Sequence, residues 1–176
     1  MTSQRFQRVA SAMHHALSLM LVVFPLISGL ILFQAGTNGV LALAPVYVDV
    51  IVPPGILAWV GIICLLAVMV GLLMGLMWHV RALFGLYAKG QVLTAPPANE
   101  ISYIGKFLFA SAVFGVLADP LFSILLTSGN PAGQRTFALM LSSGDFAYAI
   151  GGGLLWLIAW VMQEAVRMAD DSARII

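Results

Sequence analysis

Residues 56–78 read ILAWVGIICLLAVMVGLLMGLMW, and none of these 23 side chains carries a charge. An α-helix rises about 1.5 Å per residue, so roughly 20 apolar residues cross a hydrocarbon core about 30 Å thick. Three further apolar stretches of similar length occupy residues 13–33, 107–126 and 146–166. None of the four alternates as a strand would, and lipid offers no hydrogen-bond partner to an open backbone. The sequence therefore predicts an all-α polytopic membrane protein, a four-transmembrane-helix bundle that forms one domain over residues 1–176.

The composition excludes several other classes of protein. Hydrophobic residues make up 61% of the chain and charged residues 9%, and the mean hydropathy is +1.03. Soluble domains have about 45–50% apolar and about 25% charged residues. A soluble globular protein and a disordered tail are therefore excluded. The formal net charge is only +1, so we expect no direct contact with nucleic acid.

The cations are distributed very unevenly over the two sides of the predicted bundle. One side carries seven of the eight, namely Arg5, Arg8, Arg81, Lys89, Lys106, Arg167 and Arg174. Only Arg135 lies on the other side. The positive-inside rule then predicts that both termini, a central loop at 79–106 and a tail at 167–176 are cytoplasmic. We expect a multi-pass, N-in/C-in protein of a bacterial inner (cytoplasmic) membrane.

Asp119 is the one carboxylate well inside a predicted span. It shares a helix face with Ser111 and Ser123, because these polar positions recur at multiples of four residues. Placing an acidic side chain inside a membrane costs several kcal/mol of free energy unless it is paired, protonated or in contact with water. Two interpretations remain open. Asp119 is either a proton or ion site, or a structural carboxylic acid hydrogen-bonded to a neighbouring helix.

All three histidines fall on the predicted cytoplasmic side, with His14 and His15 at the start of the first span and His79 just after the second. Paired imidazoles of this kind can ligate a haem iron. In helix number and length the chain is similar to the small bacterial cytochrome b561 family, whose histidine pairs hold b-type haems. The third and fourth spans contain no histidine. We therefore expect no cofactor and no metal, and interpret the three histidines as interfacial side chains.

Small residues repeat along the second span at Ala67, Gly71 and Gly75. They also line one side of the fourth span, at Ala147, Gly151, Gly152 and Gly153. Such residues let helix backbones approach closely. The pattern favours helix packing within the chain, and the alternative is a contact in a homo-oligomer.

Charged and aromatic residues gather just beyond the second and fourth spans. Arg81, Tyr87 and Lys89 follow the second span, which we expect to continue as an amphipathic helix ending at Gly90, with Pro96 and Pro97 as a helix stop. Glu164 and Arg167, at the end of the fourth span, are spaced to pair along a helix. The two groups form either a docking platform for a partner or simply solvated helix ends.

These two segments resemble the bacterial DUF2975 family of small four-helix membrane proteins of unknown function. The resemblance lies in RALFGLYAKGQVLT (81–94), in Ile104-Gly105, and in MQEAVRMADDSARII (162–176). It implies four membrane helices, a basic aromatic stretch ending in Lys-Gly after the second, and an acidic tail after the fourth. It implies no established enzymatic activity. Because some members are encoded beside small helix-turn-helix regulators, it also implies a regulatory or accessory role.

Three functions follow, in order of preference. The first is a non-enzymatic accessory or regulatory subunit in the lipid bilayer that contacts a membrane or cytoplasmic protein through its central loop and tail. The second is a small oligomeric transporter or proton-translocating protein that uses Asp119. The third is a b-type haem redox protein. No nucleophile elbow, zinc-type histidine pair or phosphate loop supports an enzyme.

Overall fold

The computed structural model describes residues 2–42 and 48–173 and is helical, with no strand in these two ranges. The four helices are α1 (Thr2–Ala42), α2 (Ile56–Ala88), α3 (Ala95–Leu126) and α4 (Ser143–Ala173). All four are long and apolar enough to cross a membrane. The predicted fold class is confirmed, and the chain is a multi-pass membrane protein by this criterion.

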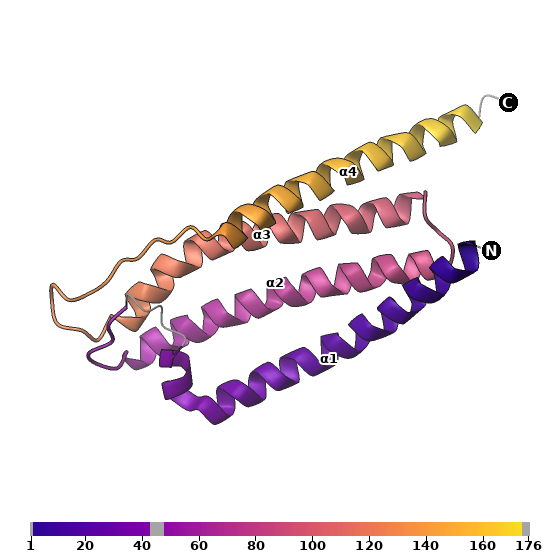
Figure 1. Ribbon diagram of the computed structural model, residues 1–176. Helices are drawn as coiled ribbons and strands as arrows, with labels where there is room; N and C mark the ends of the chain where they lie inside the picture. Colours follow the sequence, from indigo (N-terminus) through magenta and orange to yellow (C-terminus); the bar gives the residue numbers. More distant parts are fainter. Residues whose placement is uncertain (1, 43–47, 174–176) are drawn as a thin grey trace.

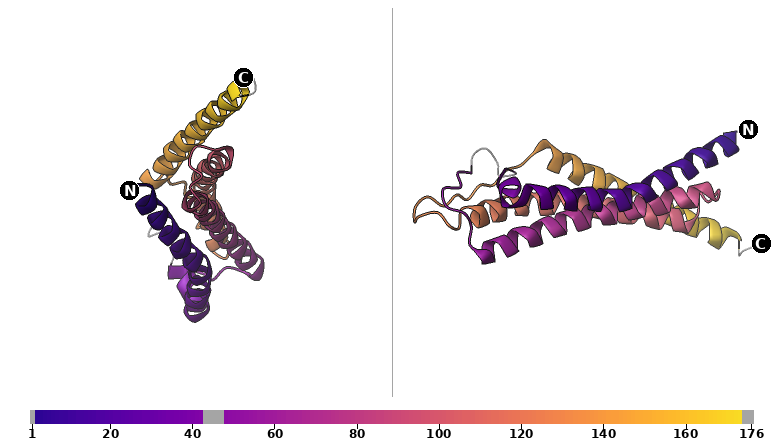
Figure 2. Two further views of the ribbon diagram at one scale, coloured as in Figure 1. Left: turned by 90° about the vertical axis from the view of Figure 1, so that its right-hand side faces the viewer. Right: turned by 90° about the horizontal axis from the view of Figure 1, so that it is seen from below.

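The helices run up and down in the order of the sequence (Figure 1). Both chain ends and the α2–α3 connection lie together at what we call the terminal end. The α1–α2 and α3–α4 connections lie at the opposite end, called here the loop end (Figure 2). This arrangement is that of four consecutive antiparallel helices.

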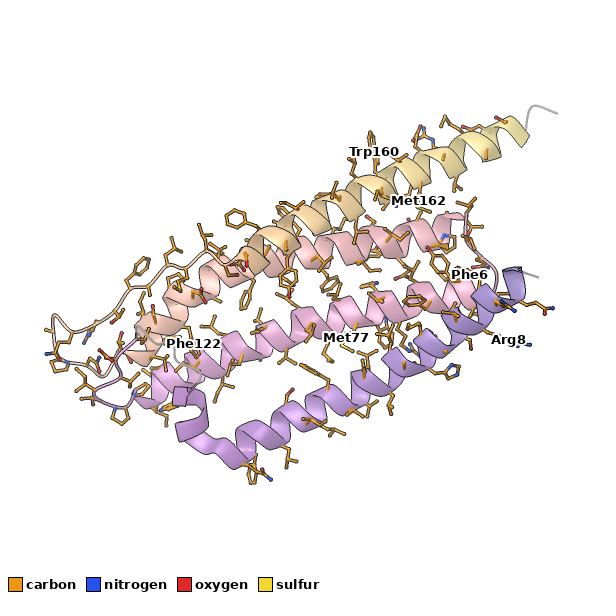
Figure 3. The ribbon with its side chains drawn as sticks, in the orientation of Figure 1. Phe6, Arg8, Met77, Phe122, Trp160 and Met162 are labelled. Atoms are coloured by element: carbon orange, nitrogen blue, oxygen red, sulfur yellow. The ribbon has the colours of Figure 1, made fainter. Side chains whose placement is uncertain are left out.

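The helices pack as an open row rather than as a closed ring. Extensive contacts join α1 to α2, α2 to α3 and α3 to α4, so that α1 and α4 each have one main neighbour. Large apolar side chains are exposed along all four helices. Figure 3 shows Trp160 on the side of α4 away from α3 and Met162 on the side facing it. In a bilayer these outer apolar faces meet lipid, which is as apolar as a leucine side chain.

The α2–α3 connection is much shorter than the predicted loop at 79–106. Helix α2 continues to Ala88, as expected, and Gly90 ends it with a φ of +80°, a conformation that glycine adopts without strain. The expectation that Pro96 and Pro97 stop a helix was wrong, because they lie in the first turn of α3. The first N–H groups of a helix have no intrahelical acceptor, so proline costs nothing there.

Two glycine contacts set the helix spacing. At Gly75 an added Cβ would clash with the Phe107 ring of α3. Gly105 of α3 and Gly152 of α4 cross backbone to backbone, and a Cβ on either would lie 2.7 Å from a carbonyl oxygen of the other helix. The other predicted packing residues do not take part, because Ala67 is exposed and a Cβ on Gly71 or Gly151 would meet nothing within 4 Å.

The loop end is held together by Asn130, which is 2% exposed. Its Oδ1 accepts the backbone N–H groups of Ile51 and Val52 at 3.0 and 3.1 Å. Its Nδ2 donates to the carbonyls of Asp49 at 2.8 Å and Gln134 at 3.0 Å. One side chain thereby joins the segment before α2 to the α3–α4 connection.

Candidate functional site

At the terminal end, Arg81 ties α2 to α1. Its Nε donates a 2.6 Å hydrogen bond to Ser18 Oγ, and its guanidinium lies 5.4 Å from the centre of the Trp78 ring. The Arg81 backbone carbonyl accepts a 2.9 Å bond from His14 Nδ1. Arg81 was predicted as a partner contact, but the structure places it half-buried in an intrachain contact.

His79 faces α3 instead. Its Nδ1 lies 2.8 Å from Glu100 Oε2, and its ring stacks on Tyr103 with centroids 4.8 Å apart. His14 of α1 contacts α2, whereas His79 of α2 contacts α3, so the two imidazoles do not converge on one ligand position. In the described part of the chain no group of three or more His, Cys, Asp or Glu side chains is placed to hold a metal ion.

The residues predicted to form one docking face are divided by α3. Tyr87 packs half-buried beside Phe6 of α1, with ring centroids 5.7 Å apart, and Lys89 is exposed where α2 ends. Glu164 and Arg167 lie on α4, 3.7 Å apart and both exposed. Because α4 packs chiefly on α3, the end of α2 and the tail of α4 form two separate surfaces.

Helix α4 continues past its last polar contact with the rest of the molecule. Gln163 Nε2 donates a 2.9 Å hydrogen bond to Asn99 Oδ1 near the start of α3. Beyond it the helix runs on to Ala173 and diverges from α3, as Figure 1 shows. Met168 is 58% exposed there. We call residues 164–173 the α4 arm.

At the loop end, Asp119 has a carboxylate neighbour that the sequence analysis missed. Asp145, in the first turn of α4, is close enough for its negative charge to act on Asp119. A Cβ on Gly115, one turn before Asp119, would lie 2.7 Å from Asp145 Oδ1. Both carboxylates are half-buried, and neither forms an ion pair with the residues that the structure describes.

Asp145 is held by a reciprocal cap at the start of α4. Its Oδ2 accepts the backbone N–H of Ser142 at 2.9 Å and the Ser142 hydroxyl at 2.8 Å, and its own N–H donates back to Ser142 Oγ at 3.2 Å. This is the geometry of a capping box. The Ser-x-x-Asp spacing at 142–145, directly before an apolar run, was the signal available in the sequence.

The hydroxyl groups of the two serines that share a face with Asp119 form hydrogen bonds with backbone groups. Ser111 Oγ donates to the Phe107 carbonyl at 2.8 Å. Ser123 is fully buried, donates to the Pro120 carbonyl at 2.9 Å, and accepts the backbone N–H of Ala138 at 3.1 Å. Ser123 thereby fastens the α3–α4 connection.

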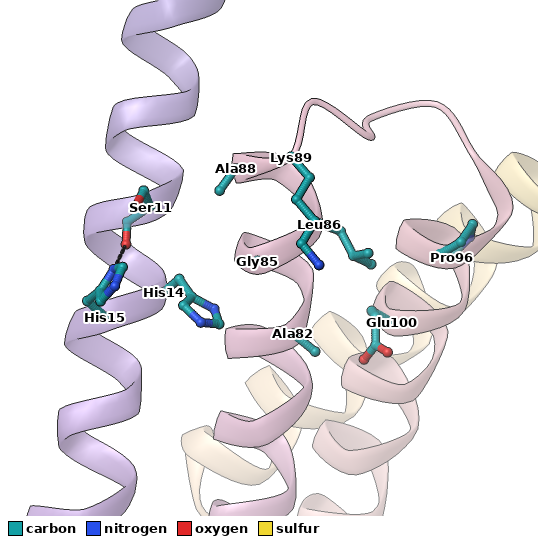
Figure 4. A pocket seen from close by; sticks show the side chains of 10 residues that line it. All are labelled: Ser11, His14, His15, Ala82, Gly85, Leu86, Ala88, Lys89, Pro96 and Glu100. Atoms are coloured by element: carbon teal, nitrogen blue, oxygen red, sulfur yellow. Dashed lines mark hydrogen bonds between the residues drawn. The ribbon is translucent and has the colours of Figure 1, made fainter.

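A cavity of about 520 Å³ opens between α1, α2 and the start of α3 at the terminal end. Its polar wall includes His14 and His15 from α1, Lys89 at the end of α2, and Glu100 from α3 (Figure 4). The rest of its wall is mainly apolar, with Ala82, Gly85, Leu86, Ala88 and Pro96. The sequence analysis did not predict this site, because its residues come from three separate segments.

Comparison with known families, curated proteins and solved structures finds no match to this chain. The resemblance to the DUF2975 family therefore stays a prediction, and the fold and the local geometry carry the functional conclusions.

Proposed function

We propose that this protein is a non-enzymatic accessory or regulatory subunit of a bacterial inner membrane, with both termini cytoplasmic, and that it contacts a protein partner through the α4 arm. The observation that carries the proposal is the arm itself. It extends as a helix beyond the Gln163–Asn99 contact, and most of its described side chains are exposed.

The arm continues a helix that is already nucleated, but little packing stabilises it. Helices in proteins are stabilised mainly by packing one face against something else, and most of the described side chains of the arm are exposed. The exposed Glu164–Arg167 pair adds little, since surface ion pairs contribute about 0–1 kcal/mol. Packing against a partner would supply the missing stabilisation.

The charge of the arm favours a protein over a lipid surface. From residue 164 to 176 the sequence contains three carboxylates, Glu164, Asp170 and Asp171, and two cations, Arg167 and Arg174, so that the side chains of this segment carry a net negative charge. A net negative segment is repelled by the anionic cytoplasmic leaflet. The partner that fits this chemistry is a protein with basic groups near the membrane surface.

Site-specific photo-cross-linking in native membranes tests the proposal. A photoreactive residue in place of Met168 is expected to give one protein adduct of defined mass. The same residue in place of Phe137, which is 69% exposed at the loop end, is the matched control and should not give that adduct.

Removal of residues 165–176 should abolish co-purification of the cross-linked partner while membrane insertion and the melting temperature in detergent stay unchanged. Undiminished co-purification after this truncation would contradict the proposal. So would an adduct that contains only lipid or a second copy of this chain.

A second candidate function is proton or ion transport through an oligomer, favoured by the proximity of Asp145 to Asp119. Two neighbouring carboxylates can share or pass a proton. Asp119→Asn should then abolish flux in proteoliposomes without affecting assembly. Asp49→Asn, which changes an exposed carboxylate at the loop end, is the control. Equal flux in the Asp119 variant and the parent would eliminate this candidate.

A further inference from the structure

The cavity at the terminal end lies at the depth of the lipid headgroups. On α1 its residues Ser11, His14 and His15 stand where the predicted apolar run begins. On α2 its residues follow the uncharged stretch that ends at Trp78. Beyond each edge of a hydrocarbon core about 30 Å thick lies an interfacial layer of headgroups.

Cationic and potentially cationic side chains face this cavity from two helices. Figure 4 shows Lys89 running back along α2 and His14 reaching toward α2 from α1. The Nδ1 atoms of His14 and His15 bond the backbone carbonyls of Arg81 and Ser11. Each ring is therefore held by its Nδ1, and when the ring is protonated its Nε2–H is left to donate to a ligand.

The only carboxylate in the described cavity wall is already partnered, because Glu100 bonds His79 at 2.8 Å. Over the whole sequence, the terminal end receives seven cations but four carboxylates, at Glu100, Glu164, Asp170 and Asp171. A ligand at this end therefore experiences a positive surrounding charge. The electrostatics favour an anion.

The apolar part of the wall indicates what kind of anion fits. The side chains of Ala82, Leu86 and Pro96 have no group that could bind a free ion, but they can pack against hydrocarbon. A phospholipid combines a charged phosphate with an apolar body, and basic pockets between membrane helices bind such headgroups. We infer that the α1–α2–α3 cavity binds an anionic phospholipid, with its phosphate beside Lys89 and the two histidines and its glycerol and first acyl carbons against the apolar wall.

Lipid titration of the delipidated full-length protein tests this inference, with bound lipid counted by native mass spectrometry. Phosphatidylglycerol is expected to bind at least about tenfold more tightly than phosphatidylcholine, because both carry a phosphate but the choline cation of phosphatidylcholine is repelled by the positive charge around the cavity. Lys89→Gln should reduce the affinity for phosphatidylglycerol about tenfold, because the phosphate loses one hydrogen bond from a charged group. Arg135→Gln removes the same charge at the loop end and should leave the affinity unchanged.

A second variant separates the cavity from diffuse surface charge. Ala82→Phe fills the cavity without changing any charge, and it should also weaken phosphatidylglycerol binding, provided that its melting temperature without lipid matches the parent. Unchanged binding in both the Lys89 and Ala82 variants would overturn the inference. Competition by inorganic phosphate at equal concentration would overturn the lipid assignment and identify a site for free phosphate.

Discussion

At the scale of single residues, Asn130 is the polar side chain with the most hydrogen bonds in the described structure. Three of its four bonds reach the segment before α2, and one stays within the α3–α4 connection. Asn130→Ala should lower the free energy of unfolding by about 2–4 kcal/mol, because several backbone groups lose their partners at a buried position. Chemical denaturation in mixed micelles measures this change.

The control for that experiment is Asn99→Ala. Asn99 is exposed and accepts one hydrogen bond, from Gln163. Its replacement should change stability by less than about 0.5 kcal/mol. Equal stability losses at Asn99 and Asn130 would show that Asn130 does not hold the loop end together.

Gly75 and Gly71 make a matched pair on α2, one helical turn apart. Gly75→Leu would press into the Phe107 ring and should destabilise the protein by about 1–3 kcal/mol, which is the usual cost of overpacking. Gly71→Leu adds the same side chain on an open face and should be close to neutral. Thermal unfolding followed by circular dichroism distinguishes them, and a larger effect at Gly71 would contradict the α2–α3 packing.

At the scale of elements, the α3–α4 contact depends on backbone atoms that cannot rotate away. A Cβ on Gly152 would lie 2.7 Å from the Gly105 carbonyl oxygen and the Phe109 nitrogen. Gly152→Leu should therefore separate α4 from α3 and expose α4 to proteolysis, whereas Gly151→Leu, at the adjacent open position, should not. Equal protease resistance of the two variants would argue against this crossing.

The boundaries of the elements show where local sequence signals succeed. The continuation of α2 to Ala88 and its end at Gly90 were predicted. A glycine that directly follows an apolar helical segment is a local signal for the end of a helix, and it needs no information from the rest of the fold. The start of α3 was not predicted, because Pro96 and Pro97 suit both the end of one helix and the first turn of the next. The glycines at 151–153 were predicted together as packing residues, and only Gly152 meets α3, since three consecutive glycines do not reveal which one faces a neighbour.

At the scale of the whole molecule, the distribution of cations makes a prediction about orientation. In a Cys64→Ser background, Val92→Cys at the terminal end should react with an impermeant maleimide only from the cytoplasmic side. Phe137→Cys at the loop end should react only from the outside. Both positions are exposed. The reverse pattern would contradict the positive-inside assignment, and reaction of both from one side would contradict four spans.

Hydropathy, length and charge position were sufficient to predict a membrane protein with four helices, because crossing a bilayer is decided by each segment on its own. Tertiary structure decided which faces meet. It placed the helices in an open row, brought Asp145 to Asp119, divided the expected docking face, and assembled the cavity around His14, Lys89 and Glu100. These contacts depend on how each helix is rotated about its own axis and on close packing between segments that are distant in the sequence. An apolar stretch that suits lipid on every side does not determine this rotation.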